Sequence, residues 1–411
     1  MNSKAFRRFV FGALSSAFLL SFSLSTRADA LDNWTTTQVS SNSFHLSNVV
    51  YANGRYVAAG GRSDGGAIMT SEDGLNWTLR ADGGWCCNPD LAWGLAYGGG
   101  RFVCVGHWGG TASSTNGTNW SYGRVAGAAD LSGVAYGHGV FAAVGPPRIW
   151  EGTTNSIFYS TDGINWQNAF QFPEEARTVW AVAYGAGKFV AVAEGGYSYT
   201  STDGIVWERA NIPGGNKITY LSGRFFVPLG VGVNLVSSDG LTWAALNTGV
   251  SGRFGRMGYA NGIFMGLTGQ FRAYTNVVVS TDGTNWLQRS TQAFYSAEDG
   301  ESSAFEIASD GRQFVVVGGT TITPGSFFNG FVHSSEALVS IAITDSAPAQ
   351  IILSGVTGRT YRVDFTPALQ TSGTNTWQPL TSLLLPNSPY SLSDPQLGSF
   401  TQRFYRAVLL P

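Results

Sequence analysis

The residue types that could do chemistry in this sequence are carboxylates and histidines on predicted loops. Glycoside hydrolysis needs two carboxyl groups that face each other across a cleft. Eight acidic residues are expected on loops of one face: Asp90, Glu151, Glu174, Glu175, Glu194, Glu298, Asp299 and Glu301. Acidic side chains on loops more often form a solvated rim. No metal site is indicated by the spacing of the four histidines His45, His107, His138 and His333. We therefore assign no catalytic, metal-binding or cofactor-binding residue, and a polysaccharide-active glycoside hydrolase or lyase is the alternative function.

Aromatic side chains on the same predicted loops offer a second kind of chemistry, which is stacking. A flat ring can pack on the apolar face of a sugar, and exposed rings also anchor protein interfaces. The candidate ligand-binding residues are Trp85, Trp108, Trp150, Tyr197, Tyr274 and Tyr295. They predict a non-catalytic recognition or scaffolding protein that binds a glycan or a cell-surface protein.

The strands that position these loops are indicated by a seven-residue phrase that recurs along the chain. It reads Ser71-Glu72-Asp73-Gly74-Leu75-Asn76-Trp77 and returns at residues 160–166 and 280–286, with looser copies ending at Trp120, Trp207 and Trp243. A repeat of about 40 residues built from short strands is typical of a β-propeller. Asp can accept backbone N–H bonds in a turn, Gly tolerates the left-handed conformation, and Trp anchors the outer strand. The positions expected to be structural are Asp73, Trp77, Asp162, Trp166, Asp203, Trp207, Asp239, Trp243, Asp282 and Trp286.

A second phrase predicts a hairpin upstream of each tryptophan. It is seen in Tyr51-Ala52-Asn53-Gly54-Arg55-Tyr56-Val57, and an Xaa-Gly pair between apolar runs is a strong hairpin signal. One repeat is therefore four strands, which in the fourth repeat are about 179–184, 188–193, 198–201 and 205–209. The seven predicted turns lie at Gly54, Gly100, Gly139, Gly187, Gly223, Gly262 and Gly311.

Seven hairpins but six downstream tryptophans leave the last repeat without an outer strand, while Asn33-Trp34-Thr35 stands alone at the start. The sequence therefore predicts an all-β protein with a seven-bladed β-propeller closed by an N-terminal strand. Residues about 32–40 are expected to pair with residues about 330–336.

The Ser-x-Asp-Gly-x-x-Trp phrases resemble a shorter form of the Asp-box, or bacterial neuraminidase repeat, of sialidases, sortilin-like receptors and photosystem assembly factors. The resemblance covers residues about 32–336 and implies the fold, because the box is a structural turn in those families. Sialidase chemistry would need an arginine triad, a tyrosine nucleophile paired with Glu, and an acidic Asp. The Arg-Ile-Pro phrase of sialidases is absent, and Arg148-Ile149-Trp150 is a poor substitute.

The two ends of the chain predict two further segments. Residues 1–30 combine a basic start, an apolar stretch from Phe9 to Leu24 and the small-residue site Ala28-Asp29-Ala30, which together are typical of a cleaved signal peptide. The expected location is therefore secreted or at the cell surface, without integral membrane insertion. Residues 31–336 form the predicted propeller. Residues 337–411 resemble an immunoglobulin-like or fibronectin-III-like module of bacterial secreted proteins, and a small β-sandwich is expected there.

The amino-acid composition argues against one class of binding partner, nucleic acids. The net charge is −2 and no basic run exists, so the electrostatic pattern of a nucleic-acid-binding protein is missing. Of three cysteines, either Cys86 or Cys87 is expected to pair with Cys104, since an exported chain can hold disulfides.

Overall fold

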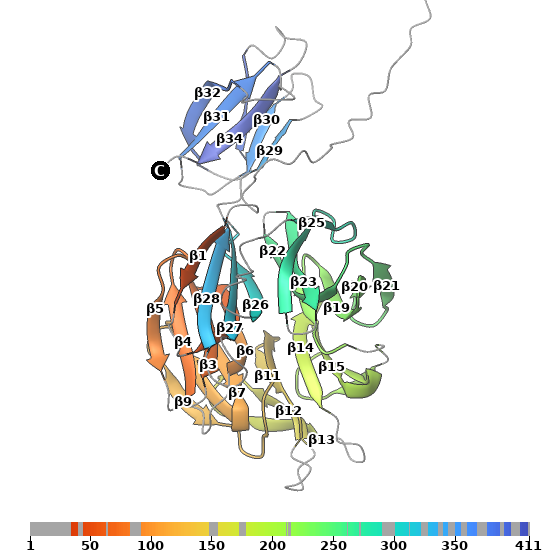
Figure 1. Ribbon diagram of the computed structural model, residues 1–411. Helices are drawn as coiled ribbons and strands as arrows, with labels where there is room; N and C mark the ends of the chain where they lie inside the picture. Colours follow the sequence, from red (N-terminus) through yellow and green to blue (C-terminus); the bar gives the residue numbers. More distant parts are fainter. Residues whose placement is uncertain are drawn as a thin grey trace, which may run out of the picture.

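The computed structural model describes most of the chain between residues 34 and 409. The described ranges are 34–39, 44–62, 65–82, 92–147, 155–171, 178–210, 212, 215–260, 262–270, 273–289, 301–311, 313–321, 328–335, 340–343, 350–354, 360–367, 376–386, 390–395 and 403–409. Within these ranges the protein is all-β, with short 3-10 turns and no α-helix (Figure 1). No helix in this part of the chain is long and apolar enough to cross a membrane.

Seven four-stranded antiparallel sheets follow one another in the described chain, and we number them sheets 1 to 7. Sheet 1 is β2 (His45–Ala52), β3 (Arg55–Arg62), β4 (Gly65–Ser71) and β5 (Thr78–Asp82), and sheet 2 is β6 (Ala92–Gly98), β7 (Arg101–Gly106), β8 (Gly110–Ser114) and β9 (Ser121–Arg124). Sheet 3 is β10 (Gly133–Gly137), β11 (Val140–Val144), β12 (Asn155–Ser160) and β13 (Gln167–Gln171), and sheet 4 is β14 (Val179–Gly185), β15 (Lys188–Ala193), β16 (Ser198–Ser201) and β17 (Glu208–Ala210). Sheet 5 is β18 (Thr219–Leu221), β19 (Arg224–Gly230), β20 (Val233–Ser237) and β21 (Ala244–Asn247), and sheet 6 is β22 (Arg253–Ala260), β23 (Ile263–Gln270), β24 (Ala273–Ser280) and β25 (Leu287–Arg289).

Sheet 7 joins the two ends of the repeat region. It consists of β26 (Glu301–Ser309), β27 (Phe314–Thr321), β28 (Phe328–Ser335) and the N-terminal strand β1 (Trp34–Gln38). β1 pairs antiparallel with β28, and Trp34 lies opposite Ser335. The pairing expected between the start of the chain and residues about 330–336 is therefore confirmed.

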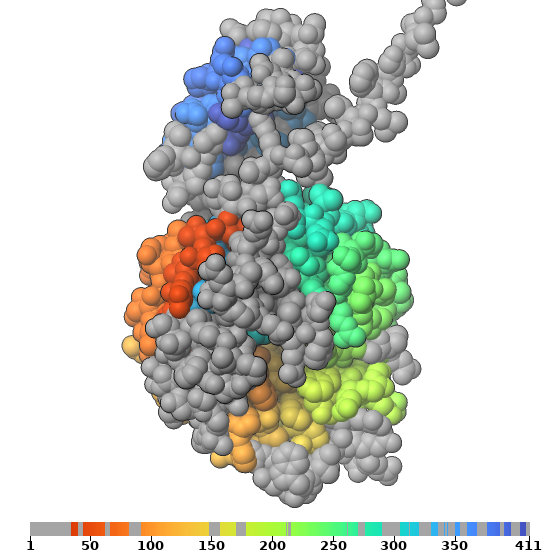
Figure 2. All heavy atoms as spheres, viewed as in Figure 1, coloured from red at the N-terminus to blue at the C-terminus, as the bar shows by residue number. Residues whose placement is uncertain are grey.

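The first strands of the sheets contact one another in sequence. β2, β6, β10, β14, β18, β22 and β26 each contact the next, and β26 also contacts β2. The colours in Figure 2 run round the body in chain order, from orange for sheet 1 to cyan for sheet 6. We call these first strands the inner strands.

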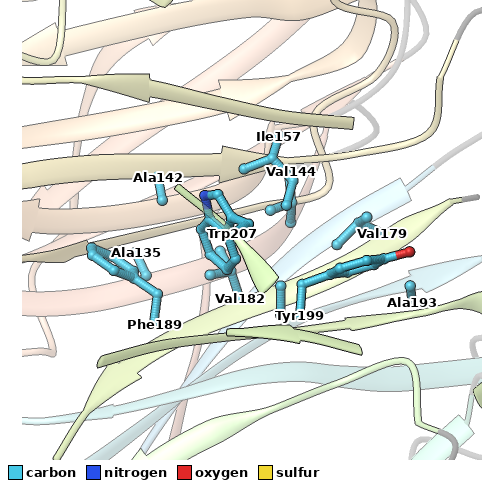
Figure 3. Packing of buried hydrophobic residues seen from close by; sticks show 11 residues of the cluster. Ala135, Ala142, Val144, Ile157, Val179, Val182, Phe189, Ala193, Tyr199 and Trp207 are labelled. Carbon is cyan, nitrogen blue, oxygen red and sulfur yellow. The ribbon is translucent and has the colours of Figure 1, made fainter. Parts of the chain in front are cut away.

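The hydrophobic core lies between neighbouring sheets. In Figure 3, Ala142 and Ile157 of sheet 3 pack with Val182, Phe189 and Trp207 of sheet 4. A strand covered on both faces is buried at every position, which explains the continuous apolar run of β15. Such interiors are close-packed, so small residues are required where strands approach.

Hairpin turns open sheets 1 to 5 as the Xaa-Gly pairs predicted, whereas in sheet 7 Ser309 pairs with Phe314 and the turn is longer. Asn53 and Gly54 both have positive φ, at 50° and 75°, which a type I′ turn needs. In the fourth repeat the first three strands match the prediction, but β17 begins at Glu208 rather than at residue 205. The amides of Ile205 and Val206 donate to the carboxylate of Asp203, so they cannot pair with β16.

The last described residues form two three-stranded sheets that stand apart from the seven in Figure 1. One contains β29 (Ser340–Ile343), β30 (Ile351–Ser354) and β33 (Tyr390–Leu392), and the other contains β31 (Thr360–Thr366), β32 (Gln378–Leu384) and β34 (Phe404–Leu409). Both sheets contribute to one core, in which Leu353, Tyr361 and Val363 are buried.

Candidate functional site

The two ends of each sheet carry different kinds of connection between strands. Strands alternate in direction, so the hairpin turns and the Ser-x-Asp-Gly phrases lie at the same end, which we call the turn end. The N-terminal ends of the inner strands lie at the opposite end, together with the connections between second and third strands. We call this opposite end the loop end.

At the turn end, the aspartate of each Ser-x-Asp-Gly turn is fully engaged with its own backbone. Oδ1 of Asp73 accepts the amide protons of Leu75 and Asn76 at 2.9 and 2.8 Å, and Oδ2 accepts the Asn76 side-chain amide at 2.7 Å. The indole Nε1 of Trp77 donates to the carbonyl of Gly74 at 2.9 Å. Partial burial raises the pKa of Asp73, but these hydrogen bonds outweigh it and lower the pKa to about 2.

The same contacts recur in the other turns. Asp162, Asp203, Asp239 and Asp282 each accept two backbone amides, and their pKa values are lowered. Carboxylates held in this way are poor proton donors or nucleophiles, since their lone pairs are already occupied.

The turns also connect neighbouring sheets. Gln313 of sheet 7 donates to the carbonyl of Asp73 at 2.6 Å, and Arg224 of sheet 5 donates to the carbonyl of Asp282 in sheet 6. Each turn glycine packs near the preceding sheet: a Cβ on Gly163 would lie 2.5 Å from Val103. A hollow of about 260 Å³ beside the first turn is lined by polar residues, among them Arg55, Glu72 and Arg80. In this hollow, Nη2 of Arg55 lies 3.6 Å from Oε1 of Glu72.

At the loop end, sheet 2 carries a rigid aromatic cluster. The 3-10 turn η1 (His107–Gly109) places Trp108 at φ 57° and ψ 28°, a left-handed conformation that is uncommon for a bulky residue. Oδ1 of Asp130 accepts the amide proton of Trp108 at 3.0 Å and lies 2.8 Å from Nδ1 of His107. Arg124 donates to the carbonyl of Trp108 at 2.8 Å, and its guanidinium lies 5.8 Å from the Trp108 ring centroid.

Sheet 4 repeats this turn with different residues. The 3-10 turn η3 (Glu194–Gly196) has Gly195 at φ 71° and ψ 19°, the position that Trp108 occupies in sheet 2. The aromatic residue of this turn is Tyr197, and the guanidinium of Arg209 lies 4.3 Å from its ring centroid. The left-handed middle position, which glycine occupies without strain in sheet 4, is occupied by tryptophan in sheet 2. The backbone strain costs about 1–2 kcal/mol.

Bulges in the inner strands place further aromatic residues at this end. The register skips Trp93 in sheet 2, Trp180 in sheet 4 and Phe305 in sheet 7. Trp93 meets His107 edge to face at 5.8 Å, and Trp180 is 42% exposed.

Charged residues precede the inner hairpins of the last three sheets. Arg256 Nε lies 3.1 Å from Glu306 Oε2, and Lys217 occupies the equivalent place in sheet 5. Burial, reinforced by the charge of Arg256 and opposed by Glu306, lowers the pKa of Lys217 to about 7. By its accessible surface the Lys217 side chain is half-buried.

The structure places two of the six candidate aromatic residues at the loop end, namely Trp108 and Tyr197. Trp85, Trp150 and Tyr295 lie outside the described residues, and Tyr274 lies in β24 without a described side chain. Three further residues of the loop end, Trp180, Arg124 and Arg209, were not predicted from the sequence. Among the acids, Glu194 begins η3 and Glu301 begins β26, whereas Asp90, Glu151, Glu174, Glu175, Glu298 and Asp299 lie outside the described residues. Cys104 is buried, and its predicted partners Cys86 and Cys87 are also outside these ranges.

Several described polar residues of the loop end have protein partners. The Ser132 hydroxyl lies within 3.3 Å of three carbonyls, those of Val144, Val179 and Trp180, so its proton has backbone acceptors. Asp130 and Glu306 are engaged as above, and no group of three or more His, Cys, Asp or Glu in the described part of the chain could hold a metal ion. The best-formed feature is therefore an aromatic and arginine surface suited to binding.

Neither a family model nor a curated protein matches the sequence. Solved structures do match. YCF48 bound to D1 peptide aligns with 74% of this chain and 96% of its own, at 16% identity and a TM-score of 0.54. YCF48 from Cyanidioschyzon merolae aligns with 73% of this chain and 98% of its own, at 13% identity and a TM-score of 0.51. The Cps50 (Swd1) β-propeller domain of Myceliophteria thermophila aligns with 74% of this chain and all of its own, at 11% identity and a TM-score of 0.50. The fold is therefore a β-propeller.

Proposed function

We propose that sheets 1 to 7 are the blades of one closed propeller and that the Ser-x-Asp-Gly turns are Asp-boxes with a structural role. The cycle of inner-strand contacts and the pairing of β1 with β28 support closure. The shared core of the two last sheets supports an immunoglobulin-like sandwich for residues 337–411. Export to the cell surface or beyond follows from the signal-peptide pattern of residues 1–30.

On this framework the protein acts as a non-catalytic recognition protein whose ligand binds at the loop end. The observation that carries the proposal is Trp108, a large aromatic residue kept in a conformation that glycine fills in the equivalent turn of sheet 4. Backbone strain of this kind persists where the surroundings enforce it, and it concentrates at binding sites. Asp130 and Arg124 hold the strained backbone, so the indole is fixed before a ligand arrives.

The solved propeller structures that match this chain also support a binding function. One of the matched propellers, YCF48, was solved with a bound peptide, and the loop end described above offers an aromatic surface for a polymeric ligand. A glycan or a cell-surface protein is the ligand class that we expect.

The test compares residues 31–411 with two variants. Trp108→Gly removes the indole and suits the backbone, while Tyr122→Ala removes a 51% exposed ring from the outer strand β9 of the same sheet. Binding is measured by native gel electrophoresis through gels that each contain one polysaccharide, and in parallel on an array of synthetic peptides. The proposal expects a ligand that Trp108→Gly loses and Tyr122→Ala keeps. Equal binding by all three proteins would place the site elsewhere, and release of new reducing ends from a bound polysaccharide would favour the hydrolase.

A further inference from the structure

We propose that the loop end holds two matching subsites, on sheets 2 and 4, which together bind one polysaccharide chain. The inference rests on the proposed function and names the ligand class of the same surface.

The two sheets match at two positions and carry similar side chains close to them. In sheet 2 the bulged residue is Trp93 and the 3-10 turn starts with His107; in sheet 4 the bulged residue is Trp180 and the turn starts with Glu194. Each sheet also has an aromatic ring with an arginine of its outer strand beside it, inside the turn in sheet 2 and directly after the turn in sheet 4. These pairs are Trp108 with Arg124 and Tyr197 with Arg209.

The other sheets lack this combination in their described residues. The position of Trp93 is taken by Ser47 in sheet 1 and by Ser132 in sheet 3, and sheet 7 has Phe305 without a described 3-10 turn. Among the described residues the arrangement therefore occurs twice, with one sheet between the copies.

The spacing between the copies follows from glycine packing. A Cβ on Gly94 would lie 3.0 Å from Cα of Gly133, and one on Gly133 would lie 3.4 Å from Cα of Ala181. These inner strands approach as closely as neighbours within one sheet, so the backbones at Trp93 and Trp180 lie at most about 10 Å apart, or two interstrand spacings. One short oligomer can reach both.

The chemistry of each subsite fits a sugar ring. The face of a pyranose carries C–H groups that pack on an aromatic ring, and its edge carries hydroxyls that need donors and acceptors. Trp180, at 42% exposure, is a flat platform rather than the base of a closed pocket. The guanidinium groups of Arg124 and Arg209 supply donors, and His107 and Glu194 stand at the equivalent place beside each tryptophan. A polysaccharide repeats one ring at a fixed interval, which matches a surface that repeats one ring-binding group.

The experiment uses residues 31–411 and gels that contain hydroxyethyl cellulose, xyloglucan, galactomannan, alginate or polygalacturonate. Trp93→Leu, Trp180→Ala and the double variant are compared with Tyr122→Ala, and the melting temperature of each confirms that it is folded. We expect retardation by at least one polymer, a loss of about tenfold in affinity for each single variant, and no retardation of the double variant. Oligosaccharides from that polymer should bind more tightly as they lengthen from dimer to hexamer, until both subsites are filled.

Three outcomes would overturn the inference. If no polymer retards the protein but an arrayed peptide binds and Trp108→Gly abolishes it, the loop-end function stands and the ligand is a polypeptide. If a polymer binds but the double variant is retarded like wild type, the two subsites are wrong. If neither polymers nor peptides bind, the proposed recognition function fails as well.

Discussion

The second repeat offers a test of the turn chemistry, because Asn116 stands where five other turns have aspartate. Oδ1 of Asn116 accepts the amides of Thr118 and Asn119, both at 2.9 Å, as the aspartates do. Asn116→Asp would make the shared acceptor of both bonds charged and give the side-chain amide of Asn119 a carboxylate oxygen, as Asn76 has in Asp73. Hydrogen bonds to charged groups are roughly twice as strong as neutral ones.

The size of the expected gain in stability follows from Asp73, the equivalent carboxylate in the first repeat. The pKa of Asp73 falls from 3.8 to about 2, which would correspond to about 2 kcal/mol in a buried site. Because this group is mostly exposed, solvent screening reduces the gain to about 1 kcal/mol. The folded-state pKa is lowered, so the gain is present above the unfolded pKa of about 3.9 and disappears as the pH falls toward 2.

Urea unfolding at neutral pH and at low pH measures this gain. Asn119→Asp is the matched control, because it adds the same charge but removes the side-chain donor, and it should not stabilise. The reasoning is refuted if Asn116→Asp gives no gain at neutral pH, or if the gain is unchanged below the carboxylate pKa.

Two other predictions concern contacts between sheets, and a third concerns the pairing of β1 with β28 within sheet 7. Tyr56→Phe should cost about 1–2 kcal/mol in urea unfolding, since the buried Tyr56 oxygen accepts the Asp310 amide of sheet 7 at 3.1 Å; an unchanged midpoint would contradict this link. Gly137→Ala should cost about 3 kcal/mol or prevent folding, because the new Cβ would lie 2.1 Å from the Tyr184 ring, whereas Gly230→Ala meets nothing within 4 Å and should be neutral in the same assay. Burial lowers the pKa of His333 from 6.5 to about 4 beside Thr36 of β1. Stability should therefore fall as the pH drops from about 6.5 toward 4, by about 3 kcal/mol for this group, and His333→Phe should flatten the pH dependence of the melting temperature; an equally steep curve would argue against His333 as its source.

The sequence predicted the repeat well because its signals are local. The Xaa-Gly turn at Asn53 and Gly54 and the Ser-x-Asp-Gly turn at Asp73 are each defined by neighbouring residues, so their hydrogen bonds follow from the phrase itself. The pairing of Trp34 with Ser335 was also predictable, since the count of strands left one partner missing at each end.

The loop end was harder to predict because its geometry depends on contacts between sheets. Nothing local to Trp108 reveals that Asp130 and Arg124 hold it in a left-handed conformation. The layer of Lys217, Arg256 and Glu306 does have a sequence signal, because these residues precede their hairpin glycines by six, six and five residues. That signal becomes visible only when the repeats are aligned on their hairpins, and Trp93 and Trp180 align in the same way.

Hydroxyl-radical footprinting of residues 31–411, with and without the polymer or peptide that binds, tests the central claim most directly. The account predicts that the ligand protects Trp93, Trp108 and Trp180 at the loop end, while exposed Leu241 at the turn end and Tyr122 on the outer strand are oxidised as before. Protection confined to Leu241 or Tyr122, with unchanged oxidation of the three tryptophans, would show that recognition takes place on another surface.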